Sequence, residues 1–202
     1  ASGLPAVVIN DGHAAMLAEM RSGALQNVQT GILLTLVPAL AGALSSMGSV
    51  GAAHRAGPGT GHIITHSDGL PCPCGQCGCF EQYASATALI RMAGGESPAD
   101  LIARARSGNA AAQAVFAQYV HELCTGIVSL NSIFAPEVVA LGGGISEAGD
   151  FLLDACHTTL ARLHANPSHP PPCRPPQHRR NHWRGDCKFE VRSYDALRPD
   201  TK

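Results

Sequence analysis

The chain has 202 residues, of which 45% are hydrophobic and 14% charged, and its formal net charge is -1 at pH 7. A chain of this length can bury one sizeable core, so we expect one main domain. The balanced charge excludes binding that depends on bulk charge, and we expect no nucleic-acid partner.

The apolar segments do not predict a membrane partner. Residues 1–8 lack the charged start and the long apolar run of a signal peptide. The long apolar stretch at residues 31–44 carries Pro38 and two glycines, which is unlike a membrane-spanning helix. We therefore expect a cytoplasmic protein.

The first predicted elements meet at an aspartate. Residues 4–9 form a valine-rich run that ends at Asn10-Asp11-Gly12, the pattern of a buried strand followed by a turn, and residues 13–21 have helical spacing. Such junctions bind ligands in α/β proteins. The Asp11 carboxylate is suited to accept a proton from a sugar hydroxyl while Asn10 orients the ring. An ordinary turn is the alternative.

A second strand is predicted at residues 31–36. The Gly/Ala/Ser-rich region that follows, up to Pro58, has no clear period and predicts no element.

Four of the eight cysteines crowd into one short segment, Cys72-Pro-Cys74-Gly-Gln-Cys77-Gly-Cys79. Zinc prefers a tetrahedron of thiolates and imidazoles, and glycines let a short loop wrap one ion. Three of these cysteines and one histidine would complete a closed, structural site. A disulfide cluster and reduced surface thiols are the alternatives. The spacing leaves open which cysteine is spare and whether His62 or His66 is the fourth ligand.

The second half of the chain predicts helices around one more strand. Helical patterns cover residues 80–92, 110–134 and 150–163, and residues 138–141 form a buried strand that runs into Gly142-Gly143-Gly144. Backbone without side chains can approach a nucleotide closely, although a tight connection is the alternative. Cys124 and Cys156 fall in helical stretches and are expected to be buried, small apolar residues.

The composition changes after Asn166, where prolines alternate with arginines and histidines. We expect no packed structure there. The predicted division is a domain at residues 1–165 and a disordered tail at residues 166–202.

In this order and spacing, the pieces resemble the ROK family of sugar kinases and repressors. The resemblance implies an α/β fold of the actin-like, ribonuclease-H-like type, partial in this chain, with a zinc-pinned loop. It implies that Asp11 is the general base and Asn10 a sugar ligand. In the family's zinc motif Cys77 falls at a non-ligand position, so the implied zinc ligands are His62, Cys72, Cys74 and Cys79. His62 and Glu81 would also contact sugar hydroxyls.

The resemblance extends to the nucleotide side, with departures. Residues 136–146 are similar to the family's nucleotide-side strand and turn, so Gly142, Gly143 and Gly144 would contact the nucleotide. The family's second glycine-rich loop corresponds to residues 37–43, where only Gly42 is retained, and Gly42 would also contact the nucleotide. The family's first phosphate loop has no counterpart in this sequence, and neither does the family's glutamate before Gly61-His62. The family's closing helix is replaced by the proline-arginine tail, which resembles a frameshifted reading frame.

The implied activity is ATP-dependent phosphorylation of a hexose or N-acetylhexosamine, with Mg-ATP as co-substrate and zinc as a structural ion. Impaired activity is expected in this chain, because the phosphate loops are missing or degenerate. The alternatives are a fragment of a sugar-sensing repressor, whose helix-turn-helix the chain lacks, and a zinc-binding remnant without catalysis. The resemblance also allows a homodimer.

Overall fold

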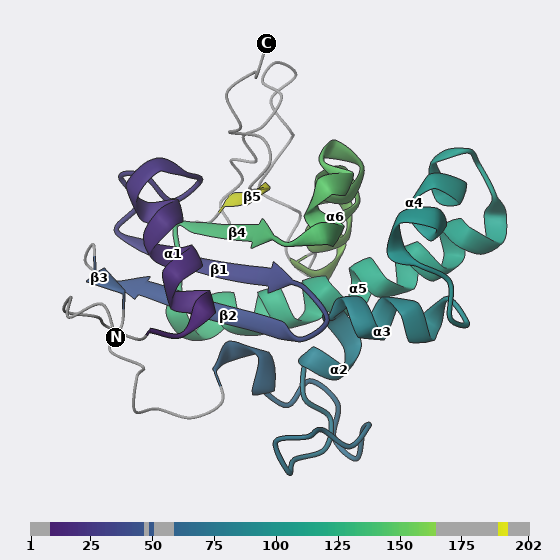
Figure 1. The fold of residues 1–202 in the computed structure, drawn as a ribbon, viewed down its shortest axis with the longest axis horizontal. Helices are drawn as coiled ribbons and strands as arrows, with labels where there is room; N and C mark the ends of the chain where they lie inside the picture. The colour runs from purple at the N-terminus through teal and green to yellow at the C-terminus, as the bar shows by residue number, and fades with distance from the viewer. Residues whose placement is uncertain (1–8, 47–48, 51–58, 165–189, 194–202) are drawn as a thin grey trace, which may run out of the picture.

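The computed structural model describes residues 9–46, 49–50, 59–164 and 190–193, and their core is a five-stranded sheet between helices (Figure 1). The sheet order is β3-β2-β1-β4-β5. The strands are β1 (Thr30–Leu36), β2 (Leu40–Ser46), β3 (Ser49–Val50), β4 (Val138–Gly142) and β5 (Glu190–Ser193). The α-helices are α1 (Asp11–Ser22), α2 (Glu81–Ala84), α3 (Ala86–Met92), α4 (Pro98–Arg106), α5 (Ala110–Phe134) and α6 (Asp150–His164), and η2 (Thr60–His62) and η3 (Gly144–Ala148) are 3-10 helices.

The sheet is mixed. β1 and β2 form an antiparallel hairpin in which Leu36 faces Leu40. β4 then lies parallel to β1, with Gly31 beside Val138, and β5 lies parallel to β4. A parallel pair needs a long crossover, and here the chain from β1 to β4 includes the zinc-motif loop and helices α2 to α5.

Each face of the sheet buries a separate apolar cluster because side chains alternate along a strand. Ile32 and Leu34 of β1 belong to the larger cluster, with α5 and α6. Leu33 belongs to the smaller cluster, with Met16 of α1. All five residues of β4 are buried, as expected for a strand covered on both faces. Figure 1 shows α1 crossing in front of the sheet and α5 behind it.

The longest helix among the described residues, α5, packs closely against Phe80, the residue that follows the cysteine segment. Its N-cap is Asn109, whose side chain accepts from the N–H of Ala112, and it ends at Ala135 in a left-handed conformation before Pro136. Gly126 in its middle leaves space for the ring of Phe80, whose atoms lie 2.2 Å from where a Cβ would stand.

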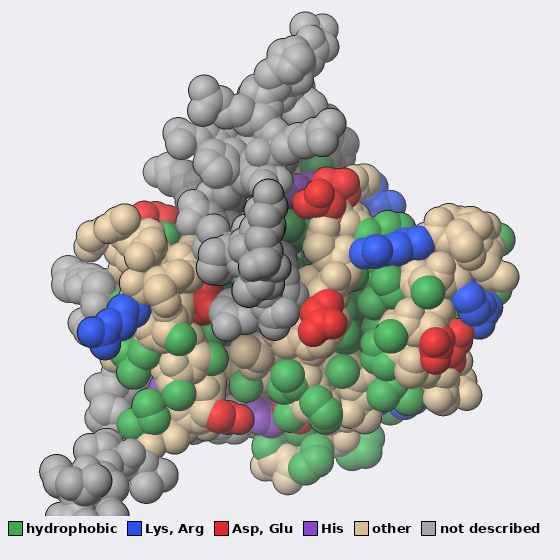
Figure 2. Space-filling model, turned by 45° about the horizontal axis from the view of Figure 1, so that its top comes forward, with side chains coloured by type: hydrophobic (Ala, Val, Ile, Leu, Met, Phe, Trp, Pro, Cys, Tyr) green, Lys and Arg blue, Asp and Glu red, His purple; other side chains and the backbone are tan. Residues whose placement is uncertain are grey.

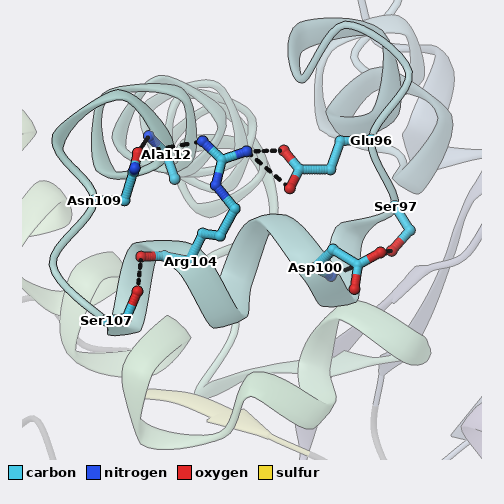
Figure 3. Close-up of polar contacts among 7 residues, drawn as sticks. All are labelled: Glu96, Ser97, Asp100, Arg104, Ser107, Asn109 and Ala112. Carbon is cyan, nitrogen blue, oxygen red and sulfur yellow. Dashed lines mark hydrogen bonds and ion pairs between the residues drawn. The ribbon is translucent and has the colours of Figure 1, made fainter.

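An ion-pair network holds the start of α5 against α4 (Figure 3). Arg104 donates to both carboxylate oxygens of Glu96, at 2.9 and 2.8 Å, and to the Asn109 side chain at 3.2 Å. Since Asn109 also caps α5, the guanidinium fixes the turn between the two helices.

The predicted elements at residues 31–36, 110–134, 138–141 and 150–163 are confirmed as β1, α5, β4 and α6. The helix predicted at residues 80–92 is two helices, because Ser85 is extended and caps α3 through the N–H of Ala88. β2 and α4 were not predicted. Cys124 and Cys156 are buried as predicted, with the Cys124 Sγ 3.6 Å from the Cys156 carbonyl oxygen.

Two predictions fall mainly outside the described residues. The strand predicted at residues 4–9 has only Ile9 within them. In the tail predicted to lack packed structure, residues 190–193 form β5 and Val191 is buried, so the prediction is wrong for these four residues. An apolar side chain beside β4 gains enough burial to join the sheet.

No helix within the described ranges is both long and apolar enough to cross a bilayer. On the face drawn in Figure 2, acidic and basic side chains are interspersed among neutral and apolar ones.

Candidate functional site

The structure brings His62, Cys72, Cys74 and Cys79 together, and their ligand atoms all lie within 4.8 Å of one another. The His62 Nδ1 is 3.5 Å from the Cys72 Sγ, and the Cys74 Sγ is 3.6 Å from the Cys79 Sγ. Ordinary Zn–S and Zn–N bond lengths in a tetrahedron give ligand separations of about 3.5 to 3.8 Å. The two hydrogen-bonded pairs match these separations, and the four ligand atoms are close enough together to hold one metal ion.

The structure also places the two residues whose roles the spacing left open. Cys77 is exposed and does not belong to the cluster. His66 does not belong to it either, because its ring pairs with Glu122 of α5 instead. Among the described residues, no cysteine of the cluster is in a disulfide.

Backbone hydrogen bonds fold the cysteine segment into a compact loop. Cys72 donates its N–H to the Gln76 carbonyl at 2.8 Å, and Gly75 donates to the Cys72 carbonyl at 2.9 Å. Gly78 has φ +78, and a Cβ on it would lie 1.7 Å from the His66 carbonyl oxygen, so only glycine fits. The loop thereby presents three thiols to one point.

The thiols differ in acidity. Burial raises the pKa of Cys79 to about 12, with further contributions from the thiols of Cys74 and Cys72. A hydrogen bond from the Gln76 backbone lowers the pKa of Cys74. A bound cation favours the thiolate form of every ligand, so crowded thiols of this kind suit a metal.

Glu81 connects the cysteine loop to the β1–β2 hairpin. Its Oε2 accepts from the Leu40 N–H at 3.2 Å, and its Oε1 lies 3.9 Å from the Cys72 Sγ. Glu81 is also the first residue of α2.

Asp11 lies at the start of α1 on the other side of the hairpin. The Asn10 side chain caps the helix by accepting from the His13 N–H, and Asp11 accepts from the Gly12 N–H at 2.8 Å. Gly12 packs against Ala41, the residue after Leu40, so Asp11 and Glu81 both lie near the first residues of β2. Asn10 and Asp11 are both exposed and available to a ligand.

The four glycines predicted to contact nucleotide differ in their environments. Gly142 ends β4, and Gly143 has φ +88 with the Leu36 carbonyl oxygen 2.7 Å from where a Cβ would stand. Gly144 has open space over its α-carbon, which leaves its backbone accessible to a ligand. Gly42 is inside β2, not in a loop as the resemblance implied, and the Thr60 hydroxyl fills the space over it.

Sequence reasoning missed the contacts of His66 and Glu122. In the sequence His66 was only an alternative metal ligand, and nothing in the spacing links it to a helix more than fifty residues later. Glu122 lies on the face of α5 beside the buried Leu123, and only the fold pairs it with His66.

Comparison with known proteins agrees with this fold. The sequence model of the ROK family matches residues 1–183. A glucokinase of Halalkalibacterium halodurans is 33% identical over 172 residues, covering 74% of this chain and 52% of its own. An N-acetylmannosamine kinase of Escherichia coli O127:H6 is 29% identical over 160 residues, covering 74% of this chain and 53% of its own.

Solved structures show the same relationship. A ROK hexokinase from Thermus thermophilus superposes with a TM-score of 0.75 at 27% identity, over 95% of this chain and 60% of its own. A ROK glucokinase from Streptomyces griseus, solved with glucose and AMPPNP, gives 0.74 at 28%, over 96% and 64%. A ROK transcriptional regulator described as a homologue of the E. coli MLC protein gives 0.72 at 26%, over 95% and 48%.

The chain is therefore an α/β protein with the actin-like fold of sugar kinases, and it belongs to the ROK family. It spans 52% and 53% of the length of the two curated relatives above.

Proposed function

We propose that the protein phosphorylates a hexose or N-acetylhexosamine with ATP. In this proposal the chain carries the residues that bind the sugar and the residues that bind zinc. The single observation that supports this most strongly is the order of groups across the hairpin. Asp11 lies on one side of the start of β2, and Glu81 with the His62–cysteine cluster lies on the other. A sugar bound beside the start of β2 would meet carboxylates, an amide and an imidazole, the side chains that recognise hydroxyl groups.

In this proposal Asp11 accepts the proton of the sugar hydroxyl that attacks the γ-phosphate. Its exposure fits the role, because a base must reach the substrate. Asn10 orients the sugar ring, and His62 and Glu81 bind other hydroxyls. Magnesium bound with ATP neutralises the developing phosphate charge.

Zinc would be held by His62, Cys72, Cys74 and Cys79 and would act structurally, because four protein ligands leave no position for water. These residues would fix the loop that bears His62 and precedes Glu81. Removing the metal should then weaken sugar binding before it changes the chemical step. Reduced thiols of this kind also fit a cytoplasmic setting.

On the nucleotide side, we propose that Gly142, Gly143 and Gly144 bring backbone close to the nucleotide. We expect the hairpin turn at residues 37–39 to bind phosphate weakly, because it offers few free backbone N–H groups. Pro38 has no N–H to donate, and the Leu40 N–H already serves Glu81. Because the turn lacks these donors, we expect impaired turnover. We assign Gly42 at most a minor role in binding the nucleotide.

Sugar sensing by a ROK regulator is the second candidate. The likeness to the transcriptional regulator favours it, since that structure matches almost as well as the kinases do. A regulator needs the sugar site and the zinc loop but not the base.

Calorimetry with glucose and N-acetylmannosamine, beside an ATP-dependent phosphorylation assay, tests the proposal. We expect sugar binding that the Asp11→Asn variant retains, and phosphorylation that this variant abolishes. Asp68→Asn, on an exposed residue of the loop, is the control and should change neither. Binding without turnover by the native chain would select sensing or a remnant, and absence of binding to any hexose would refute the proposal.

A further inference from the structure

His66 lies outside the four-residue cluster, but its side chain ties the cluster's loop to α5. Its Nε2 is 3.3 Å from the Glu122 Oε2, and the two side chains are 35% and 15% exposed. A partly shielded contact of this kind is stronger than an exposed surface pair.

Two further contacts fix the orientation of the His66 ring. It stacks on the Tyr83 ring with centroids 3.8 Å apart and planes 16° from parallel. The Thr65 hydroxyl lies 3.1 Å from Nδ1 and can donate to it, which places the proton of the neutral imidazole on Nε2, toward Glu122. The His66 Nε2–H therefore donates to the Glu122 carboxylate.

The His66 backbone passes this constraint to the metal ligands. Its N–H donates to the Gly78 carbonyl at 3.2 Å, and its own carbonyl accepts from Gly69 at 3.2 Å. Gly78 is packed against the His66 carbonyl so closely that no side chain fits between them. Cys79 follows Gly78 directly, so a displacement of His66 displaces Cys79.

Tyr83 contacts the other side of the loop, at Leu70. Its hydroxyl accepts from the Leu70 N–H at 2.7 Å, and Leu70 in turn accepts from Gly78 at 2.8 Å. His66 thus bonds to the Gly78 backbone directly, and Tyr83 is linked to it through Leu70. The stacked rings of His66 and Tyr83 hold each other in place.

We propose that His66, Tyr83 and Glu122 are positioning residues that hold Cys79 at binding distance from the other three metal ligands. The inference rests on the proposed zinc site and adds residues that set its affinity from outside it. None of the three belongs to the four-residue cluster; each would act through the Gly78–Cys79 backbone.

Zinc affinity, measured by competition with a chromophoric chelator, tests this. Glu122→Ala and His66→Ala should each weaken zinc binding roughly three- to tenfold. The double variant should lose little more than either single one, because both remove the same contact. Glu122→Gln keeps an acceptor oxygen and should restore most of the affinity, and Tyr83→Phe should weaken binding through the lost Leu70 contact alone.

A purely structural role would lower the denaturation midpoint and leave zinc affinity unchanged, and that result would overturn the inference. Hydrogen exchange of the Gly78 and Phe80 amides in the zinc-free chain gives a second readout that needs no metal. Faster exchange in Glu122→Ala supports the positioning role, and unchanged exchange overturns it. If the native chain binds no zinc, the proposed zinc site itself is refuted. If the native chain and the variants bind zinc with equal affinity, only the positioning role is refuted.

Discussion

Glu81 and Leu40 are joined by a hydrogen bond of 3.2 Å from the Leu40 N–H to the Glu81 Oε2. The bond ties the helix that follows the cysteine loop to the first residue of β2. The Glu81 side of the proposed sugar site is thereby held against β2.

Glu81→Ala should therefore change stability and ligand binding together. Loss of the acceptor leaves a partly buried N–H without its partner, at a cost of about 1 kcal/mol of unfolding free energy. Sugar affinity should fall as well. Glu81→Gln separates the two effects, because its amide oxygen still accepts from Leu40 while its charge is gone. Urea unfolding and sugar calorimetry on both variants measure this, and equal stability of all three proteins would contradict it.

Gly78→Ala should be far more damaging than Gly75→Ala, although both glycines have positive φ. A Cβ at Gly78 would collide with the His66 carbonyl, whereas a Cβ at Gly75 meets open space. Strain alone costs about 1 kcal/mol at Gly75, and strain with overpacking costs about 3 kcal/mol or more at Gly78. Chemical denaturation of the pair checks the difference, and similar losses would show that the loop is not packed as described.

Gly126→Ala should destabilise the chain even though alanine favours a helix by up to about 1 kcal/mol. The new methyl would lie 2.2 Å from the ring of Phe80, which is fully buried. We expect a net loss of about 1 to 2 kcal/mol. Phe80→Leu in the same chain should relieve part of it, so that the two changes are not additive in a double-mutant cycle. Additive losses would mean that the two residues do not touch.

Glu19 should make stability depend on pH. Burial raises its pKa above the usual value of 4.5, offset in part by a hydrogen bond from the Ala24 N–H. The folded state then holds this proton more tightly than the unfolded state, so the contribution of Glu19 to stability falls as pH rises from about 4.5 through the folded pKa.

Glu19→Gln keeps an acceptor for Ala24 and cannot ionise. Its stability relative to the native chain should therefore improve as pH rises through that window, measured by urea unfolding at several pH values. Glu147→Gln, on an exposed side chain, controls for the loss of one surface charge. A constant difference between Glu19→Gln and the native chain would contradict the prediction.

Much of the fold was predictable because its periodicities are strong. The apolar stripe of α5 and the apolar run of β4 identify both elements, and Pro136 marks the boundary between them. β2 was missed because its Gly, Ala and Ser residues have little β propensity, and only pairing with β1 makes it a strand. α4 has a good capping residue, Ser97, but only nine residues to carry a pattern.

The candidate site was predictable where its residues are neighbours in sequence. The cysteine segment and the Asn10–Asp11 turn are local motifs, and the resemblance supplied His62. The contacts Glu81–Leu40 and His66–Glu122 span 41 and 56 residues, and local patterns do not encode such pairs. Gly42 shows the reverse case, because a glycine expected to meet phosphate packs against Thr60.

Zinc content and X-ray absorption at the zinc edge, measured on the native chain and on Cys77→Ser and Cys74→Ser, test the central claim most directly. We predict one zinc per chain with three sulfur ligands and one nitrogen ligand in the native chain and in Cys77→Ser, and loss of the metal or of one sulfur in Cys74→Ser. A native chain without zinc, or a coordination shell that changes in Cys77→Ser and not in Cys74→Ser, would contradict the account.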